Sequence, residues 1–229
     1  RPIPDYGPFE EFEQQVGPDT LCFAAGCMAA SPMHLILRDF IDPTQFYLHY
    51  QDHPEKIREL ADSMEGYFRR LIEVVARSPA QGVVWGANFD DMLTYPAFFK
   101  KEILPWLQYA CDRFHNAGKL VASHTDGENK GLMDLIKDSG IDLADSVCPF
   151  PMSKVGIGEY YRRWGDRIAI LGGIPQDFLL ADSTTVDELN GYMEQFFSDI
   201  APGRRFIVGI ADAVPPDADF DRLKIIGEK

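Results

Sequence analysis

Residues 120–172 read LVASHTDGENKGLMDLIKDSGIDLADSVCPFPMSKVGIGEYYRRWGDRIAILG, and this stretch decides the fold. Three short apolar runs, LVAS, IDLADSV and IAILG, begin at residues 120, 141 and 168. Helix-like segments at 131–139 and 157–164 separate these runs, and each is followed by a glycine, a common helix stop. Short apolar strands that alternate with helices are typical of a parallel sheet with helical crossovers. The stretch therefore predicts an α/β fold.

The same alternation continues toward both ends of the chain. Further apolar runs predict three more strands, which makes six in total, at residues 21–28, 83–87 and 206–210. The remaining predicted helices cover residues 44–50, 55–77, 96–116, 185–199 and 220–228. In the helix at 55–77, apolar residues recur at the spacing of one buried helical face. The sequence contains no linker-like stretch, so we expect a single domain over residues 1–229.

The overall composition excludes several classes of protein. The 229 residues include 22 Lys and Arg against 36 Asp and Glu, which gives a formal net charge of −14. Such an acidic chain is unsuited to bind nucleic acid or an anionic membrane, because both reward basic patches. A hydrophobic share of 45% indicates a packed core rather than disorder. Four cysteines without a C-x-x-C pair, no signal-peptide pattern and no long apolar run predict a cytoplasmic location.

Polar residues follow several predicted strands. In enzymes with a parallel barrel, the active site lies at these C-terminal ends of the strands. His124 and Asp126 follow LVAS, and at this spacing both side chains can point to one side. A histidine nitrogen and a carboxylate oxygen are suitable ligands for Zn²⁺. The candidates for a third ligand are Asp212, the first choice, and Asp90, Asp91 and Cys148. The alternative without a metal is a turn at Asp126 and Gly127 beside a buried, hydrogen-bonded His124.

Two adjacent carboxylates, Asp90 and Asp91, follow the strand predicted at 83–87. Two carboxylates this close together are candidates for a general acid or base. The alternative is that one of them caps a helix and the other is solvated. Asp145 lies within IDLADSV, where strand alternation points its side chain toward the interior of a barrel.

The order of motifs along most of the chain resembles the uroporphyrinogen decarboxylase superfamily, which also contains the cobamide-dependent methyltransferases. The matching motifs are Ala29-Ala30-Ser31-Pro32, Asp52-His53-Pro54-Glu55, Phe89-Asp90-Asp91, Phe99 with Ile103-Leu104-Pro105, His124-Thr125-Asp126-Gly127, Trp164-Gly165-Asp166, Leu171-Gly172-Gly173-Ile174 and Val214-Pro215-Pro216. The resemblance implies a (β/α)8 TIM barrel, and members of this family begin with two more βα units. We therefore expect a barrel that lacks its first two units here, so that residues 1–229 form the C-terminal two-thirds of a longer barrel.

The methyltransferase branch of this family holds zinc at an H-x-C motif and a distant cysteine near the last strand. His124-Thr125-Asp126 resembles the first motif with Asp126 in the cysteine position, and Asp212 falls where the distant cysteine would be. The resemblance therefore implies a divalent metal held by His124, Asp126 and Asp212. Zn²⁺ is the expected ion, and Mn²⁺ and Fe²⁺ are alternatives because the ligand set is rich in oxygen.

The function implied by the resemblance is metal-dependent methyl transfer with a corrinoid as methyl carrier and a small-molecule substrate. In this reading Asp90 orients the substrate or acts as a base, and Tyr95 donates a hydrogen bond. A corrinoid protein is a possible partner, and a homodimer is an expectation from the family.

Two other functions stay open at this stage. The first is decarboxylation of uroporphyrinogen or a related acid, with Asp90 or Asp91 near the pyrrole N–H groups. Against it, the chain has no counterpart to the Arg-rich N-terminal segment of the decarboxylase. It also reads Ile210-Ala211-Asp212 where the decarboxylase tends to have Gly-His-Gly. The second is a non-catalytic binding subunit.

Overall fold

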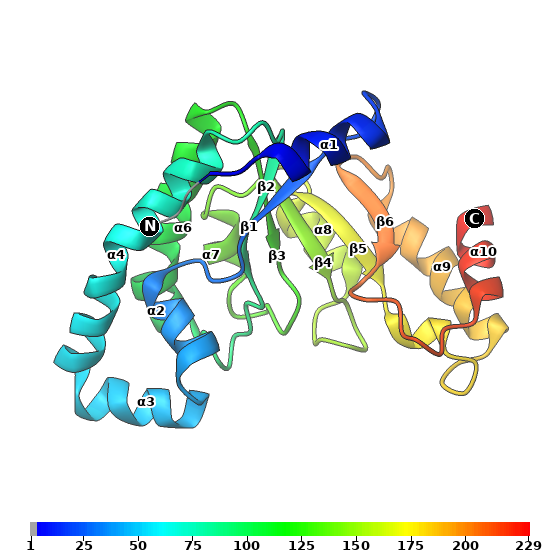
Figure 1. Ribbon diagram of the computed structural model, residues 1–229. Helices are drawn as coiled ribbons and strands as arrows, with labels where there is room; N and C mark the ends of the chain where they lie inside the picture. Colours follow the sequence, from blue (N-terminus) through cyan, green and yellow to red (C-terminus); the bar gives the residue numbers. More distant parts are fainter. Residues whose placement is uncertain (1–3) are drawn as a thin grey trace.

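A computed structural model describes residues 4–229 and shows a six-stranded parallel sheet (Figure 1). The strands lie side by side in sequence order: β1 (Phe23–Cys27), β2 (Gly82–Ala87), β3 (Leu120–His124), β4 (Leu143–Val147), β5 (Ala169–Ile174) and β6 (Phe206–Ile210). All six predicted strands and the α/β class are confirmed. Within the described residues β1 and β6 are the two open edges of the sheet, so the expected closed barrel is not confirmed.

The predicted helices are also present. They are α3 (Pro43–Asp52), α4 (Pro54–Ala76), α5 (Pro96–Phe98), α6 (Leu104–Asn116), α7 (Met133–Lys137), α8 (Ile157–Trp164), α9 (Val186–Ile200) and α10 (Phe220–Glu228). The helix predicted at 96–116 is interrupted by a π-helical segment, η2 (Phe99–Ile103). Connections between sequential neighbours in a parallel sheet place their helices on one face. Accordingly, α4 contacts β1, α6 contacts β2 and β3, and α8 contacts β5.

Four helical segments were not predicted from the sequence. They are α1 (Gly7–Val16), α2 (Pro32–Leu35), the π-helical η1 (Ile36–Phe40) and the 3-10 helix η3 (Gln176–Leu179). The helix α1 buries none of its side chains. Figure 1 shows α1 at the end of the sheet where the strands begin, and α2 and α3 at the opposite end.

The core between the sheet and its helices is built on large aromatic side chains. Trp85 on β2 packs edge-on against Phe114 of α6, with ring centroids 5.4 Å apart, and against Phe68 of α4 at 6.4 Å. All three side chains are fully buried. Aromatic pairs in this geometry stabilise a fold beyond the burial of their area. They fix α4 and α6 on the sheet and so hold the strand ends in place. No helix among residues 4–229 has both the length and the apolar character needed to cross a membrane.

Candidate metal centre

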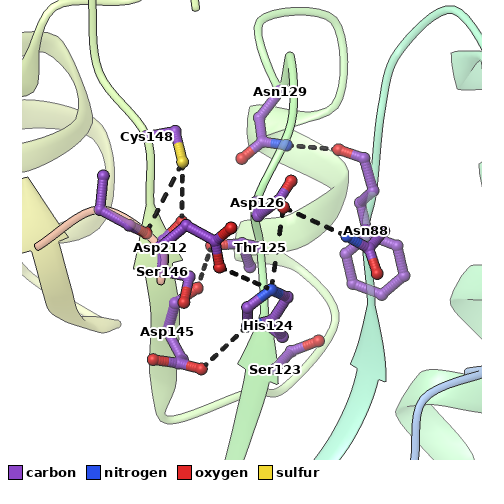
Figure 2. Close-up of polar contacts among 12 residues, drawn as sticks. Asn88, Ser123, His124, Thr125, Asp126, Asn129, Asp145, Ser146, Cys148 and Asp212 are labelled. Atoms are coloured by element: carbon purple, nitrogen blue, oxygen red, sulfur yellow. Dashed lines mark hydrogen bonds and ion pairs between the residues drawn. The ribbon is translucent and has the colours of Figure 1, made fainter. Parts of the chain in front are cut away.

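The last residue of β3, His124, lies opposite Asp145 of β4 in the strand register. The Nδ1 atom of His124 is 3.1 Å from Oδ2 of Asp145, so the protonated Nδ1 donates to the carboxylate (Figure 2). This hydrogen bond raises the pKa of His124, and burial opposes the shift. Because Asp145 engages Nδ1, the other ring nitrogen, Nε2, is the one available to a ligand.

Two carboxylates face this free nitrogen. Nε2 of His124 is 3.7 Å from Oδ1 of Asp212 and 3.9 Å from Oδ2 of Asp126. One ligand atom from each of the three residues lies within 4.8 Å of the others. Three ligand atoms at the corners of a tetrahedral zinc site with bonds of 2.0–2.1 Å are about 3.3–3.4 Å apart. The two distances from Nε2 exceed this spacing by about half an ångström or less, and no pair of the three ligand atoms is more than 4.8 Å apart, so small side-chain movements would bring all three onto one ion.

The surroundings of the three side chains also fit a metal. Histidines that bind metals almost always donate their second ring N–H to a carboxylate or carbonyl, as His124 does to Asp145. The side chains of His124, Asp126 and Asp212 are 19%, 28% and 36% exposed, which leaves the group open to solvent on one side. The residues present thus fit a divalent ion with an open coordination position for water or substrate.

Asp126 is held in an environment of mixed charge. Burial raises the pKa of its carboxyl group, and the nearby Asp212 and Asp90 raise it further. His124 and a hydrogen bond from Asn88 oppose that shift. The Asn88 amide Nδ2 donates to Oδ2 of Asp126 at 3.3 Å (Figure 2). The charged groups with the largest effect on Asp126 are thus the His124 imidazole and two carboxylates.

Cys148, one alternative third ligand, lies just beyond β4 beside the same group (Figure 2). Its thiol contacts the carbonyl oxygens of Ser146 and Ala211 at 3.4 and 3.6 Å. Burial raises the pKa of the Cys148 thiol to about 12, and the carboxylates of Asp126 and Asp212 add to this shift. The thiol is directed at backbone carbonyls, and Asp212 is the third member of the group that the described residues form.

The two carboxylates predicted as catalytic groups contact backbone amides. Oδ1 of Asp90 accepts from the N–H groups of Met92 and Leu93 at 2.8 and 3.2 Å, and Oδ2 accepts from the N–H of Glu128 at 3.3 Å. Asp91 accepts from the N–H of Gly131 at 2.7 Å through Oδ2. Both residues therefore join the loop after β2 to the loop after β3. A catalytic role for either one stays a prediction.

Tyr95 lies at the start of α5 and is 37% exposed. Its ring packs 5.7 Å from that of Tyr47 on α3 and 5.9 Å from that of Phe98. In the part of the chain that the structure describes, no hydrogen bond or ion pair connects Tyr95 to the His124 group. Its role as a hydrogen-bond donor to a substrate stays a prediction.

Neither Asn88 nor Asp145 was among the site residues predicted from the sequence. For Asp145 the sequence carried a partial signal, because strand alternation directs its side chain to the same side as the expected site. Its pairing with His124 depends on the register between β3 and β4, which no sequence pattern supplies. For Asn88 the position directly after a strand was the only signal.

The comparisons with known proteins agree with this architecture. Residues 35–228 match the family model described as uroporphyrinogen decarboxylase (URO-D). No curated protein sequence matches the chain significantly. Among solved structures, a methyltransferase from Methanosarcina mazei is similar, with a TM-score of 0.68 at 14% sequence identity. The alignment covers 94% of this chain and 59% of that one, and at this identity the likeness shows the fold alone. Because the family match extends over residues 35–228, this chain belongs to the uroporphyrinogen decarboxylase family.

Proposed function

We propose that this protein is a metal-dependent methyltransferase in which His124, Asp126 and Asp212 hold a divalent ion, with a corrinoid as methyl carrier and a small molecule as substrate. Zn²⁺ is the first choice of ion, and Mn²⁺ and Fe²⁺ are the alternatives for a ligand set with two carboxylates. A corrinoid protein as partner and a homodimer belong to the same proposal.

The hydrogen bond from Nδ1 of His124 to Asp145 is the observation that carries this proposal. It fixes the ring so that Nε2 faces Asp126 and Asp212 at 3.9 and 3.7 Å. Two carboxylates close to one another repel, so their placement at the second nitrogen is unfavourable unless a positive charge lies between them. A cation between them removes this repulsion. The methyltransferase among the structural neighbours is consistent with the proposal and shows only the fold.

The chemistry would be divided between the ion and the chain. When bound, the ion supplies Lewis acidity that polarises a small substrate or lowers the pKa of its reacting group. Asp145 keeps the proton on Nδ1 of His124 and directs the ring. Asp90 and Tyr95 are the candidates to orient the substrate or to exchange a proton with it, and Asp91 is a further candidate acid.

The charge of the site favours this function over decarboxylation of a porphyrinogen. The His124 ring lies within 4 Å of three carboxylates, those of Asp145, Asp212 and Asp126. A substrate with several carboxylates would meet repulsion here, because like charges a few ångströms apart cost energy even near a protein surface. A small neutral or cationic substrate would not.

We also propose that residues 1–229 are one domain and the C-terminal two-thirds of a (β/α)8 barrel. The unpaired outer edges of β1 and β6 support this, since exposed strand edges in native proteins are usually paired or covered. The chain also spans only 59% of the length of the similar methyltransferase.

Metal analysis of the purified protein tests the proposed function. The metal-free protein is dialysed against Zn²⁺, Mn²⁺ or Fe²⁺ without oxygen, and bound metal is counted by mass spectrometry. We expect about one ion per chain, and we expect His124→Ala to lose it. His115→Ala is the matched control, because His115 forms a similar pair with Asp142 at 2.8 Å elsewhere on the surface. If the chain binds no ion, or if His124→Ala retains it, the proposal is wrong.

Two other results would establish one of the two alternative functions, decarboxylation or a binding subunit. Turnover of a porphyrinogen tetra-acid without metal or corrinoid would establish decarboxylation instead. Neither metal binding nor turnover, together with a protein that co-purifies in fixed ratio, would establish a binding subunit.

A further inference from the structure

We propose that Asn88 is a positioning residue that aims the Asp126 carboxylate into the metal centre. This inference rests on the proposed function, because it concerns the same ion. Asn88 itself is not a ligand in this proposal. It holds the Asp126 carboxylate at the distance that leaves room for the ion.

Asn88 contacts the end of β3 in two ways. Its backbone N–H donates to the carbonyl oxygen of His124 at 2.9 Å, and its side-chain Nδ2 donates to Oδ2 of Asp126 at 3.3 Å. Figure 2 shows the Asn88 amide and the His124 ring both directed at the Asp126 carboxylate. One residue from the neighbouring strand end therefore fixes the backbone of one ligand and the side chain of another.

A bulge at the end of β2 gives the Asn88 side chain its direction. The register between β2 and β3 shifts between Val84 and Ala87, so β2 has a bulge at its end. Gly86 within the bulge has φ of 81°, and Asn88 itself has φ of 54°. Bulges beside functional sites re-aim side chains, and asparagine is one of the few residues that tolerate the left-handed region. Strain of this kind is typical of sites that need a side chain in one orientation.

The Asn88 amide sets the separation between the Asp126 carboxylate and the His124 ring. The same carboxylate oxygen, Oδ2 of Asp126, accepts from Asn88 and lies 3.9 Å from Nε2 of His124. A carboxylate free to rotate would close onto a protonated imidazole nitrogen to a hydrogen bond of about 2.7–2.9 Å. That contact would occupy the nitrogen that the ion needs. Asn88 holds the carboxylate back, so the space between the two ligands stays open.

Cobalt binding tests this role, because the visible absorption of Co²⁺ reports the number and geometry of its ligands. The variant Asn88→Gly keeps the left-handed backbone and removes the amide. We expect its affinity for Co²⁺ to fall by about 10- to 100-fold, the usual effect of losing a group that orients a ligand. We also expect its absorption bands to change.

Two controls make the test specific to Asp126. Ser146 has φ of 58° at the end of β4, so Ser146→Gly relaxes a similar backbone strain and should leave Co²⁺ affinity unchanged. The second control is a double-mutant cycle with Asp126→Ala. If Asn88 acts through Asp126, removing the amide from the Asp126→Ala variant should cost little further affinity.

The outcomes are distinct. Wild-type affinity and spectrum in Asn88→Gly would overturn the role of Asn88 and leave the metal centre intact. Full additivity in the cycle would also overturn it, because the amide would then act independently of Asp126. If the wild-type protein binds neither Co²⁺ nor any of Zn²⁺, Mn²⁺ and Fe²⁺, both the proposed function and this inference are wrong. Should the glycine variant not fold, Asn88→Ser replaces it, since serine tolerates this backbone at Ser146 and is too short to reach Asp126.

Discussion

His124 and Asp145 are register partners on adjacent parallel strands, and their side chains meet at 3.1 Å between Nδ1 and Oδ2. Strand pairing thus places the carboxylate beside the ring without help from a loop. Because strands are more rigid than loops, the direction of Nε2 is set by the most stable part of the fold.

The first prediction concerns this pair. Asp145→Ala removes the acceptor of the Nδ1 proton, so the ring can rotate and Nε2 loses its fixed direction. We expect the dissociation constant for Zn²⁺ to rise by about 10- to 100-fold. Competition with a chromogenic chelator measures it. Asp134→Ala is the control, because Asp134 is an exposed partner of Arg163. Equal affinity in the Asp145→Ala and wild-type proteins would contradict a role for the pair in metal binding.

The second prediction separates structural from catalytic roles of Asp90. Asp90→Ala leaves the N–H groups of Met92, Leu93 and Glu128 without their acceptor. We expect a loss of about 1–3 kcal/mol in the free energy of unfolding, with bound Zn²⁺ unchanged. Urea denaturation measures the loss. Asp90→Asn keeps an acceptor oxygen, so it should recover part of the stability. If methyl transfer is nevertheless abolished in Asp90→Asn, the carboxylate also acts on the substrate.

The strands could be predicted from the sequence, and so could the gathering of polar side chains at their ends, whereas the choice of His124, Asp126 and Asp212 as ligands drew on the resemblance and stays a prediction. Buried strands such as IAILG are short apolar runs between glycines, and polar residues directly after them must collect at one edge of a parallel sheet. The helix α1 was not predicted, and it packs no buried side chain against the core. The contacts of Asp145 and Asn88 depend on strand register and on a bulge, which are properties of the folded sheet. The backbone amides that Asp90 accepts come from a neighbouring turn and loop that the sequence leaves undetermined.

The third prediction tests the aromatic core that holds α4 on the sheet. Phe68 is fully buried against Trp85 and Trp106, so Phe68→Ala removes a ring from a packed interior and leaves a cavity. We expect a loss of about 3–5 kcal/mol in the free energy of unfolding. Tyr67→Ala is the control at the adjacent position, where the ring is 46% exposed, and should cost much less. Denaturation curves with similar midpoints for the two variants would contradict this packing.

The last prediction is a dependence of stability on pH that arises from a buried histidine. His34 of α2 accepts a hydrogen bond from the N–H of Ala30 through Nδ1, and its side chain is 2% exposed. Burial lowers the pKa of His34 from 6.5 to about 3, because desolvation disfavours the charged ring, and Arg38 adds to the shift.

The sign follows from proton binding in the two states. Below pH 6.5 the unfolded chain protonates His34, whereas the folded chain keeps it neutral until about pH 3. The free energy of unfolding is therefore unaffected by His34 above pH 6.5, and it falls progressively as the pH drops from 6.5 toward 3. Between pH 7 and pH 5 this one group should cost about 2 kcal/mol. In His34→Asn, unfolding measured at the two pH values should show a smaller loss than the wild type by about that amount. His49→Asn, at an exposed position on α3, leaves His34 in place and should retain the wild-type loss. An unchanged pH dependence in His34→Asn would mean that other groups dominate acid destabilisation.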